Sequence, residues 1–325
     1  MSHVNRREFL VGAAASSLAT LVACTGVPTT FRGPIVARLD ILSAGKGSAF
    51  LPYAQAISAH LSARGLMSTA IESAGSIENV RRINNDPALI ATVFLGTAFE
   101  GFSGQGTWTQ GMQFDNIRAL TPMYETSFQL IALTSSAIIR VELVSGKRVG
   151  VGPVGGPAEV YFKGLIAIAN VTPTLVTGTP TELVADLLAG RIDVLWQGAV
   201  TPIPSIKQIA ESRDATVFGL SEKHQAEMLA RYPILSASNV AAGIYRNQVQ
   251  PLRSVAAWNF VMANAALSDA DAYWITRTIL DVADPTVMHP TARETRAENA
   301  VNNRVIPFHR GALRYYRERG IRLVI

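Results

Sequence analysis

A glycine-rich stretch, Val149–Ala169, has the residue spacing of a dinucleotide-binding turn. It reads VGVGPVGGPAEVYFKGLIAIA, and Gly150, Gly152 and Gly155 satisfy the pattern G-x-G-x-x-G between a short apolar strand and a helix. In a dinucleotide site the following strand ends in an Asp or Glu that binds the ribose. Here the following strand, TPTLVTG, ends without a carboxylate, and Pro153 removes one amide N–H from the turn. The spacing alone therefore does not predict a nicotinamide or flavin site.

The other reactive side chains form no catalytic pattern along the chain. The five histidines are scattered, with no H-E-x-x-H segment and no i, i+4 pair for zinc. There is no G-x-S-x-G segment for a serine nucleophile, and the acidic residues offer no evident pair for hydrolysis. The sequence therefore predicts a protein that is not an enzyme and that uses neither a metal nor a cofactor.

Three segments share the order strand, small-residue turn, helix. They are SAGKGSAF (43–50), ESAGSIEN (72–79) and GPVGGPAE (152–159). The start of a helix offers amide N–H groups and a positive dipole end, which together suit a carboxylate. Lys46 adds a cation to the first segment. Tight glycine turns explain any one of these segments on its own, but their recurrence predicts a ligand cleft.

The elements that would position these turns alternate between apolar strands and helical patterns, which predicts an α/β fold. The clearest helix is TPTELVADLLAG, with Thr179 at the N-cap, Glu182 three residues later and Gly190 just beyond the end. In the long extended stretch that contains Tyr124–Leu133, Pro122 indicates a sheet edge or a break. From Pro251 to the C-terminus the pattern is mainly helical.

Two extended segments, around Tyr124–Leu133 and Leu235–Tyr245, bracket one block of strand–helix–strand units. We therefore expect two α/β lobes joined by two crossing segments, as the length of 325 residues also favours. Lobe one would comprise residues 35–130 and 244–325, and lobe two residues 131–243. A cleft between two such lobes is a usual place for a small ligand.

The N-terminus has the pattern of an export signal. Arg6 and Arg7 precede Phe9 and Leu10, and the uncharged run that ends at Ala23 is shorter than the roughly 20 residues that span a membrane. This pattern predicts a cleaved signal over residues 1–23 and is similar to the twin-arginine type.

The only cysteine, Cys24, follows Leu-Val-Ala in a segment that resembles a lipobox. We expect its thiol to carry a lipid, with residues 24–34 as a flexible tether and the folded body in the periplasm. A cysteine that is there by coincidence is the alternative. In either case one cysteine excludes a disulfide framework.

Composition and charge limit the classes of protein to which this chain can belong. A chain with 48% hydrophobic and 16% charged residues is globular, which excludes disordered and fibrous proteins. The net charge of +5 is modest, and the basic stretch RGALRYYRERGIR is typical of a solvated helix face. We therefore expect no nucleic-acid partner.

Several segments resemble motifs of the TAXI family of solute-binding receptors, which serve TRAP-type transporters. SAGSIENVRRI is similar to the family's S-x-G-S-x-E-N-L-R, and GKRVGVGPVGG to its G-K-R-V-x-V-G-x-x-G-S-G-T. LLAGRIDVLWQGAVTPIPSI resembles G-x-I-D-A followed by P-x-P, and AAGIY resembles A-G-x-Y. FHRGALRYYRERG resembles the closing H-P-G-A-x-R-Y-Y-R-E-x-G. The similarity runs from about Ile35 to Ile325 and implies a two-lobed fold like that of type II periplasmic binding proteins.

In that family, turns from both lobes close over a small organic acid, often a dicarboxylate or an amino acid. The matching positions here are Gly45, Lys46, Gly47, Ser48, Ala49, Gly75, Ser76, Gly155, Gly156, Pro157 and Ala158.

The matching positions also depart from the family pattern. The family's G-S-G-T is Gly155–Ala158 here, which lacks both hydroxyls and contains a proline that cannot donate. The family's Gln-Ser-Asp after the third strand is Phe94–Gly96, and a threonine is replaced by Ala49. Because each change removes polarity, we expect a more apolar monocarboxylate rather than a tightly held dicarboxylate.

We expect Lys46 to be the main cation for this ligand, with Phe50, Phe94 and Trp196 as walls. Trp196 ends a strand and would face the cleft, or would instead belong to the core.

The resemblance implies a receptor that delivers a small acid to the membrane subunits of a TRAP transporter and performs no catalysis. Two alternatives stay open. One is an exported cofactor-dependent oxidoreductase, since the twin-arginine route often carries cofactor enzymes. The other is a sensor or scaffold that is no longer coupled to transport, because the binding turns have lost polar residues.

Overall fold

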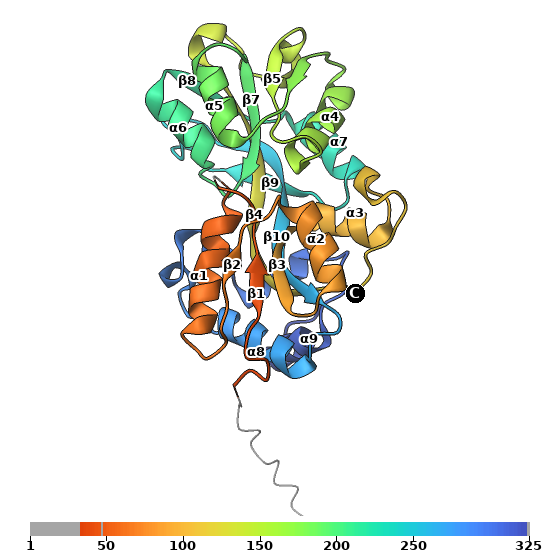
Figure 1. Cartoon of the computed structure of the whole chain (residues 1–325). Helices are drawn as coiled ribbons and strands as arrows, with labels where there is room; N and C mark the ends of the chain where they lie inside the picture. Colours follow the sequence, from red (N-terminus) through yellow and green to blue (C-terminus); the bar gives the residue numbers. More distant parts are fainter. Residues whose placement is uncertain (1–32, 47, 324–325) are drawn as a thin grey trace, which may run out of the picture. The chain divides into compact units, whose positions relative to one another are not determined.

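The computed structural model describes residues 33–46 and 48–323. The predicted signal segment 1–23, Cys24, the tether up to residue 32 and Gly47 lie outside the described residues. Within the described part, one ten-stranded mixed sheet has the strand order β2-β1-β3-β10-β4-β7-β5-β6, with β8 beside β4 and β9 beside β10 (Figure 1). The α/β fold predicted from the sequence is confirmed.

We call the elements around the first half of this sheet lobe one. They are β1 (Asp40–Leu42), α1 (Phe50–Ser62), β2 (Ala70–Ile71), α2 (Ser76–Asn85), β3 (Leu89–Phe94), α3 (Leu95–Ser103), α8 (Asp269–Leu280) and α9 (Arg310–Glu318). The strands β2, β1 and β3 pair in parallel, so each helix returns the chain to the start of the next strand.

We call the elements around the other half lobe two. They are β5 (Arg148–Gly150), α4 (Pro157–Ala169), β6 (Thr174–Val176), α5 (Pro180–Leu188), β7 (Val194–Ala199), α6 (Pro204–Ser212), β8 (Ala215–Phe218), α7 (Glu222–Arg231) and β9 (Ser236–Val240).

Two long antiparallel strands, β4 (Ile117–Leu133) and β10 (Leu252–Asn264), run from one lobe into the other (Figure 1). The predicted first crossing is part of β4. The strand continues through Pro122, and its register against β10 shifts just beyond that residue. The predicted lobe boundary after residue 130 falls inside β4, and the exact lobe limits stay a prediction.

The second crossing was predicted wrongly, at Leu235–Tyr245. That region forms the shorter β9, and the crossing strand is β10, where a helical pattern was expected. The wrong prediction of helix comes from the sequence of β10, LRSVAAWNFVMAN, which is buried on both faces from Ser254 onward. A strand buried on both faces has no alternation of polar and apolar residues, and its alanines favour helix.

The buried residues form separate cores in the two lobes. One cluster fills lobe one around β1, β3 and α8, and two others fill lobe two on either side of β7. Phe94, at the end of β3 in lobe one, belongs to a lobe-two cluster, where its ring contacts Phe128 and Tyr161. The lobes are therefore in van der Waals contact at the end of β3.

The capping box predicted at the start of α5 is confirmed. Thr179 accepts a hydrogen bond from the Glu182 N–H, and Glu182 Oε2 accepts one from the Thr179 N–H at 2.8 Å. We expect Thr179→Ala to lower the free energy of unfolding by about 1 kcal/mol, because the Glu182 N–H loses its acceptor and the Glu182 carboxylate loses the Thr179 hydroxyl as a donor. Urea unfolding measures the change. Thr177→Ala, a neighbouring exposed threonine without such a cap, is the control and is expected to be neutral.

Candidate functional site

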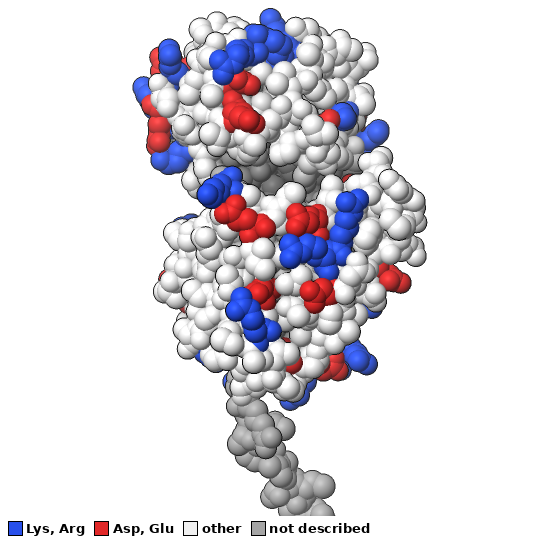
Figure 2. All heavy atoms as spheres, in the orientation of Figure 1, with Lys and Arg blue, Asp and Glu red and all other residues white. Residues whose placement is uncertain are grey.

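A cavity of about 450 Å³ lies between the lobes. Its lining includes the starts of α1, α2 and α3 from lobe one and of α4, α5 and α6 from lobe two. Figure 2 shows this face of the molecule hollowed between the lobes, with charged side chains around the hollow. The three strand–turn–helix segments singled out in the sequence thus converge on one space, whose volume suits a small molecule.

Most residues predicted for the ligand site line this cavity. They are Gly45, Lys46, Ser48, Ala49, Phe50, Gly75, Ser76, Phe94, Gly155, Gly156, Pro157 and Ala158. Gly47 lies outside the described residues.

Trp196 does not line the cavity, so its predicted role as a wall is corrected. Its side chain is fully buried and stacks on Phe128, with ring centroids 5.5 Å apart. Its indole N–H donates to the Ala158 carbonyl oxygen at 2.9 Å, at the start of α4. Trp196 belongs to one of the two lobe-two cores, so it supports the cleft turn from beneath rather than facing the ligand.

Two of the turn amides are already used by the protein itself. The Ala74 N–H donates to Glu78 Oε2 at 2.8 Å, and the Gly155 N–H donates to Glu159 Oε2 at 2.6 Å. Gly75 and Gly155 have φ angles of 103° and 71°, which favour glycine. These carboxylates fix the turns, so a ligand would meet the first amides of the helices rather than every amide of the turns.

The Glu159 carboxylate gives the second-lobe turn a dependence on pH. Burial acts to raise its pKa, but the Lys163 ammonium at 2.6 Å and the Gly155 N–H outweigh burial, and the pKa lies below its ordinary 4.5. A depressed pKa stabilises the folded state above pH 4.5, and this contribution is lost as the pH falls through the folded pKa. We expect Glu159→Gln to weaken the loss of stability between pH 5 and 3.

Thermal unfolding from pH 7 to 3 measures this loss. Glu227→Gln, which changes an exposed carboxylate on α7, is the control and is expected to leave the acid dependence as in the parent. Equal acid profiles for Glu159→Gln and the parent would contradict the role given to Glu159.

The floor of the cleft contains polar residues that the sequence analysis missed. Tyr124, Asn259, Gln197 and Ser205 are buried, and one polar atom of each has no hydrogen-bond partner in the described structure. They come from β4, β10, β7 and α6. The sequence signal for such a residue is a single polar residue in an apolar run, such as the Asn in AAWNFVM. This signal indicates a cleft residue only when the position of the strand in the sheet is known.

The walls of the cleft are aromatic and its charge is small. Phe50 packs edge-on against Tyr124, and Phe94 against Phe128. Of the described lining residues, Lys46 alone is charged, and it is exposed at the mouth of the cleft. The cleft therefore offers helix N-termini and one cation, with no carboxylate among the described lining side chains.

Tyr245, in the AAGIY segment, holds the start of α6 at the cleft. Its hydroxyl donates to Gln129 Oε1 at 2.6 Å and accepts from the Ile203 N–H at 2.7 Å. These two hydrogen bonds connect the N-terminus of α6 to the crossing strand β4. Tyr245 therefore positions α6 and does not itself contact a ligand.

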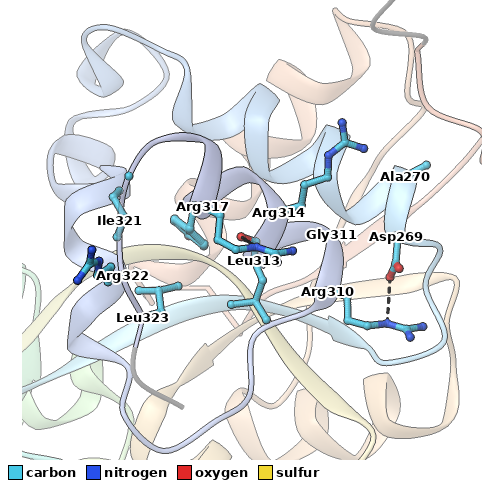
Figure 3. Close-up of a pocket in the computed structure, with 12 residues that line it drawn as sticks. Asp269, Ala270, Arg310, Gly311, Leu313, Arg314, Arg317, Ile321, Arg322 and Leu323 are labelled. Carbon is cyan, nitrogen blue, oxygen red and sulfur yellow. Dashed lines mark hydrogen bonds and ion pairs between the residues drawn. The ribbon is translucent and has the colours of Figure 1, made fainter. Parts of the chain in front are cut away.

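A second, larger hollow of about 1140 Å³ lies beside α8, α9 and the segment that follows (Figure 3). It is lined by Arg310, Arg314, Arg317 and Arg322, whose guanidinium groups point in different directions (Figure 3). Arg310 pairs with Asp269, and Arg314 donates to Glu318. Because these cations do not converge and two are paired, we place the candidate site in the interlobe cleft.

The described residues contain no group of three His, Cys, Asp or Glu side chains arranged to hold a metal ion. None of their helices is long and apolar enough to cross a bilayer.

Two α/β lobes joined by long crossing strands, with helix N-termini around the cleft between them, define the fold of periplasmic binding proteins. Solved structures agree. MatC (Rpa3494) from Rhodopseudomonas palustris with bound malate has a TM-score of 0.54 at 14% identity, over 79% of this chain and 89% of that one. Rpa4515 from R. palustris with adipate has a TM-score of 0.55 at 13% identity, over 77% of this chain and 85% of that one. The periplasmic binding protein BugD has a TM-score of 0.53 at 10% identity, over 79% of this chain and 86% of that one.

The chain itself matches the NMT1-like family over residues 41–320 and belongs to that family. This match covers both lobes and both crossing strands.

Proposed function

We propose that this protein is an extracytoplasmic solute-binding receptor that captures a small organic acid in the interlobe cleft. The observation that carries the proposal is the charge of the cleft. Helix N-termini from both lobes and Lys46 face a space whose described lining has no carboxylate. Such a space favours an anion. The malate and adipate held by the two R. palustris neighbours support the choice of a carboxylic acid.

The receptor works by closure of the two lobes. A ligand that contacts helix starts in both lobes stabilises the closed arrangement over the open one, because only the closed form makes both sets of contacts. β4 and β10 carry the hinge, since they are the strands that join the lobes. No chemical step is needed, and the protein is not an enzyme in this proposal.

The resemblance to TAXI receptors extends the proposal to a partner. The closed receptor would deliver its acid to the membrane subunits of a TRAP-type transporter, with the chain exported by a twin-arginine signal and anchored through a lipid on Cys24. An exported oxidoreductase or a sensor uncoupled from transport are the rivals. An absorption spectrum of the purified protein would reveal a redox cofactor, and uptake assays with and without the transporter subunits would separate receptor from sensor.

The binding test is a thermal-shift and calorimetric screen of mono- and dicarboxylates against neutral compounds of equal size. We expect carboxylates to raise the melting temperature and neutral analogues to leave it unchanged. Lys46→Met is expected to weaken carboxylate binding about threefold to tenfold, since an exposed cation contributes modestly. Stabilisation by neutral compounds alone would contradict the proposal.

A further inference from the structure

Two unpartnered oxygens in the floor of the cleft specify what the ligand must present there. We infer that the ligand is a carboxylic acid that also carries a neutral hydrogen-bond donor, a hydroxyl or a carboxamide, and is neither a plain dicarboxylate nor an α-amino acid. This inference rests on the proposed function and names the class of acid. The residues that select this class are Asn259 on β10 and Gln197 on β7.

The orientation of the Asn259 amide is fixed by its neighbours. Its Nδ2 donates to the Tyr124 carbonyl oxygen and to Thr126 Oγ1, both at 2.8 Å. A backbone carbonyl can only accept, so the nitrogen must lie on that side. The oxygen Oδ1 is left as an acceptor, fully buried and without a partner in the described structure.

The Gln197 amide is oriented by a backbone carbonyl in the same way. Its Nε2 donates to the Gly198 carbonyl oxygen at 3.2 Å, so its Oε1 is the free atom. This oxygen is also buried and without a partner in the described structure, and the residue as a whole is 8% exposed. Both residues line the cavity, and the orientation of neither amide can reverse.

An acceptor in a buried site needs a donor. A ligand carboxylate placed against Asn259 and Gln197 would set oxygens against oxygens, and an alkyl group would leave both amides without partners. A hydroxyl or carboxamide N–H satisfies them. The other two unpartnered groups, Tyr124 Oη and Ser205 Oγ, are hydroxyls that can donate or accept, so they suit either ligand.

The absence of acidic side chains from the described lining decides between kinds of donor. An α-ammonium group would find only neutral oxygens, close to helix N-termini that carry positive charge. Because its charge would be buried without a counter-ion, a neutral donor is favoured. The carboxylate then lies toward the helix starts and Lys46, and the neutral donor toward Asn259 on β10 and Gln197 on β7.

Matched pairs of acids test the inference on the purified full chain. Calorimetry would compare phenyllactate with 3-phenylpropanoate, and succinamate with succinate and aspartate. We expect the donor-bearing member of each pair to bind at least tenfold more tightly than its partner. Equal or tighter binding of 3-phenylpropanoate, succinate or aspartate would overturn the inference while leaving the proposed receptor function intact. If no acid of the panel binds, the receptor function fails as well.

Variants of the acceptor give a second measurement. Gln197→Met has nearly the same volume and removes the oxygen, so we expect it to reduce the preference for the donor-bearing acid at least fivefold. Gln208→Met, an exposed change on α6, is the control and should keep the preference. An unchanged preference in Gln197→Met would remove Gln197 from the inference. Should this variant fail to fold, the pairwise comparison in the unmodified protein still decides.

Discussion

Trp196→Ala is expected to lower the free energy of unfolding by about 3–5 kcal/mol, the usual cost of truncating a large buried aromatic side chain. The indole is fully buried and stacks on Phe128, and its ring centroid lies 5.6 Å from that of Phe162. These neighbours belong to β4 and α4, which are held by the sheet and by helix packing, so the cavity left by alanine would not collapse. Denaturant unfolding monitored by far-UV circular dichroism measures the loss.

Trp196→Phe separates packing from the hydrogen bond to Ala158. Phenylalanine keeps most of the aromatic contact but leaves the Ala158 carbonyl without its indole donor, so we expect a loss of about 1–2 kcal/mol. Ligand affinity is expected to fall in Trp196→Ala, because the start of α4 loses its support. A stable Trp196→Ala protein that has lost only ligand binding would return Trp196 to the cleft wall and contradict the buried position.

The strand–turn–helix units were predictable because each has local signals. Thr179, Pro180 and Glu182 mark a helix start through contacts within one turn of the chain, and the structure has the capping box as expected. Glycine turns such as the one at Gly155 likewise depend on a local φ angle. Signals that act over a few residues can be read from one sequence.

The parts that could not be predicted depend on contacts between distant segments. β10 reads as helix because its position in the sheet depends on segments more than a hundred residues away: β3 and β4 pair with its two edges, and helices such as α2 and α3 pack against it. Trp196 was expected at the end of its strand, facing the cleft, but β7 continues to Ala199 and pairs with β4 through Trp196, which therefore lies in the core. Asn259 and Tyr124 enter the floor of the cleft only because the two crossing strands are neighbours.

The sequence also suggested a cleft poorer in polarity than the structure shows. The hydroxyls lost from the second-lobe turn are real losses at the rim, as Gly156 and Pro157 line the cavity there. The buried polar residues with unpartnered atoms are instead on β4, β10, β7 and α6, and the strand–turn–helix segments of the sequence give no information about them. The helix starts that suit a carboxylate and the amide oxygens that suit a neutral donor therefore come from different parts of the chain.

Gly96→Val is expected to raise the Kd for the ligand at least tenfold, or about 1.4 kcal/mol, by holding the lobes apart. Gly96 lies on α3 of lobe one, and a Cβ atom there would lie 2.5 Å from Tyr161 Oη and 2.6 Å from Ile234 Cδ1. These two neighbours belong to lobe two, Tyr161 on α4 and Ile234 after α7, and a third, Phe94 Cε1 at 2.7 Å, belongs to the end of β3. The lobes approach this closely because the glycine has no side chain.

The added valine can be accommodated in two ways, by distorting a packed lobe or by rotating the lobes about β4 and β10. Overpacking within a core costs about 1–3 kcal/mol. Opening at the hinge instead removes contacts that a bound ligand needs, so the strain appears as lost affinity. Calorimetry with the tightest acid of the panel measures the change, and small-angle scattering of the unliganded variant would detect the opening.

Gly101→Val is the matched control, since it makes the same change on the same helix. A Cβ at Gly101 would lie 2.9 Å from Trp108 Cη2 and Val80 Cγ1, and both of these residues belong to lobe one. This variant should therefore lose stability with little effect on affinity, because its strain does not cross the cleft. Equal losses of affinity in the two variants would show that the effect comes from α3 itself, and closure of the lobes would then no longer explain binding.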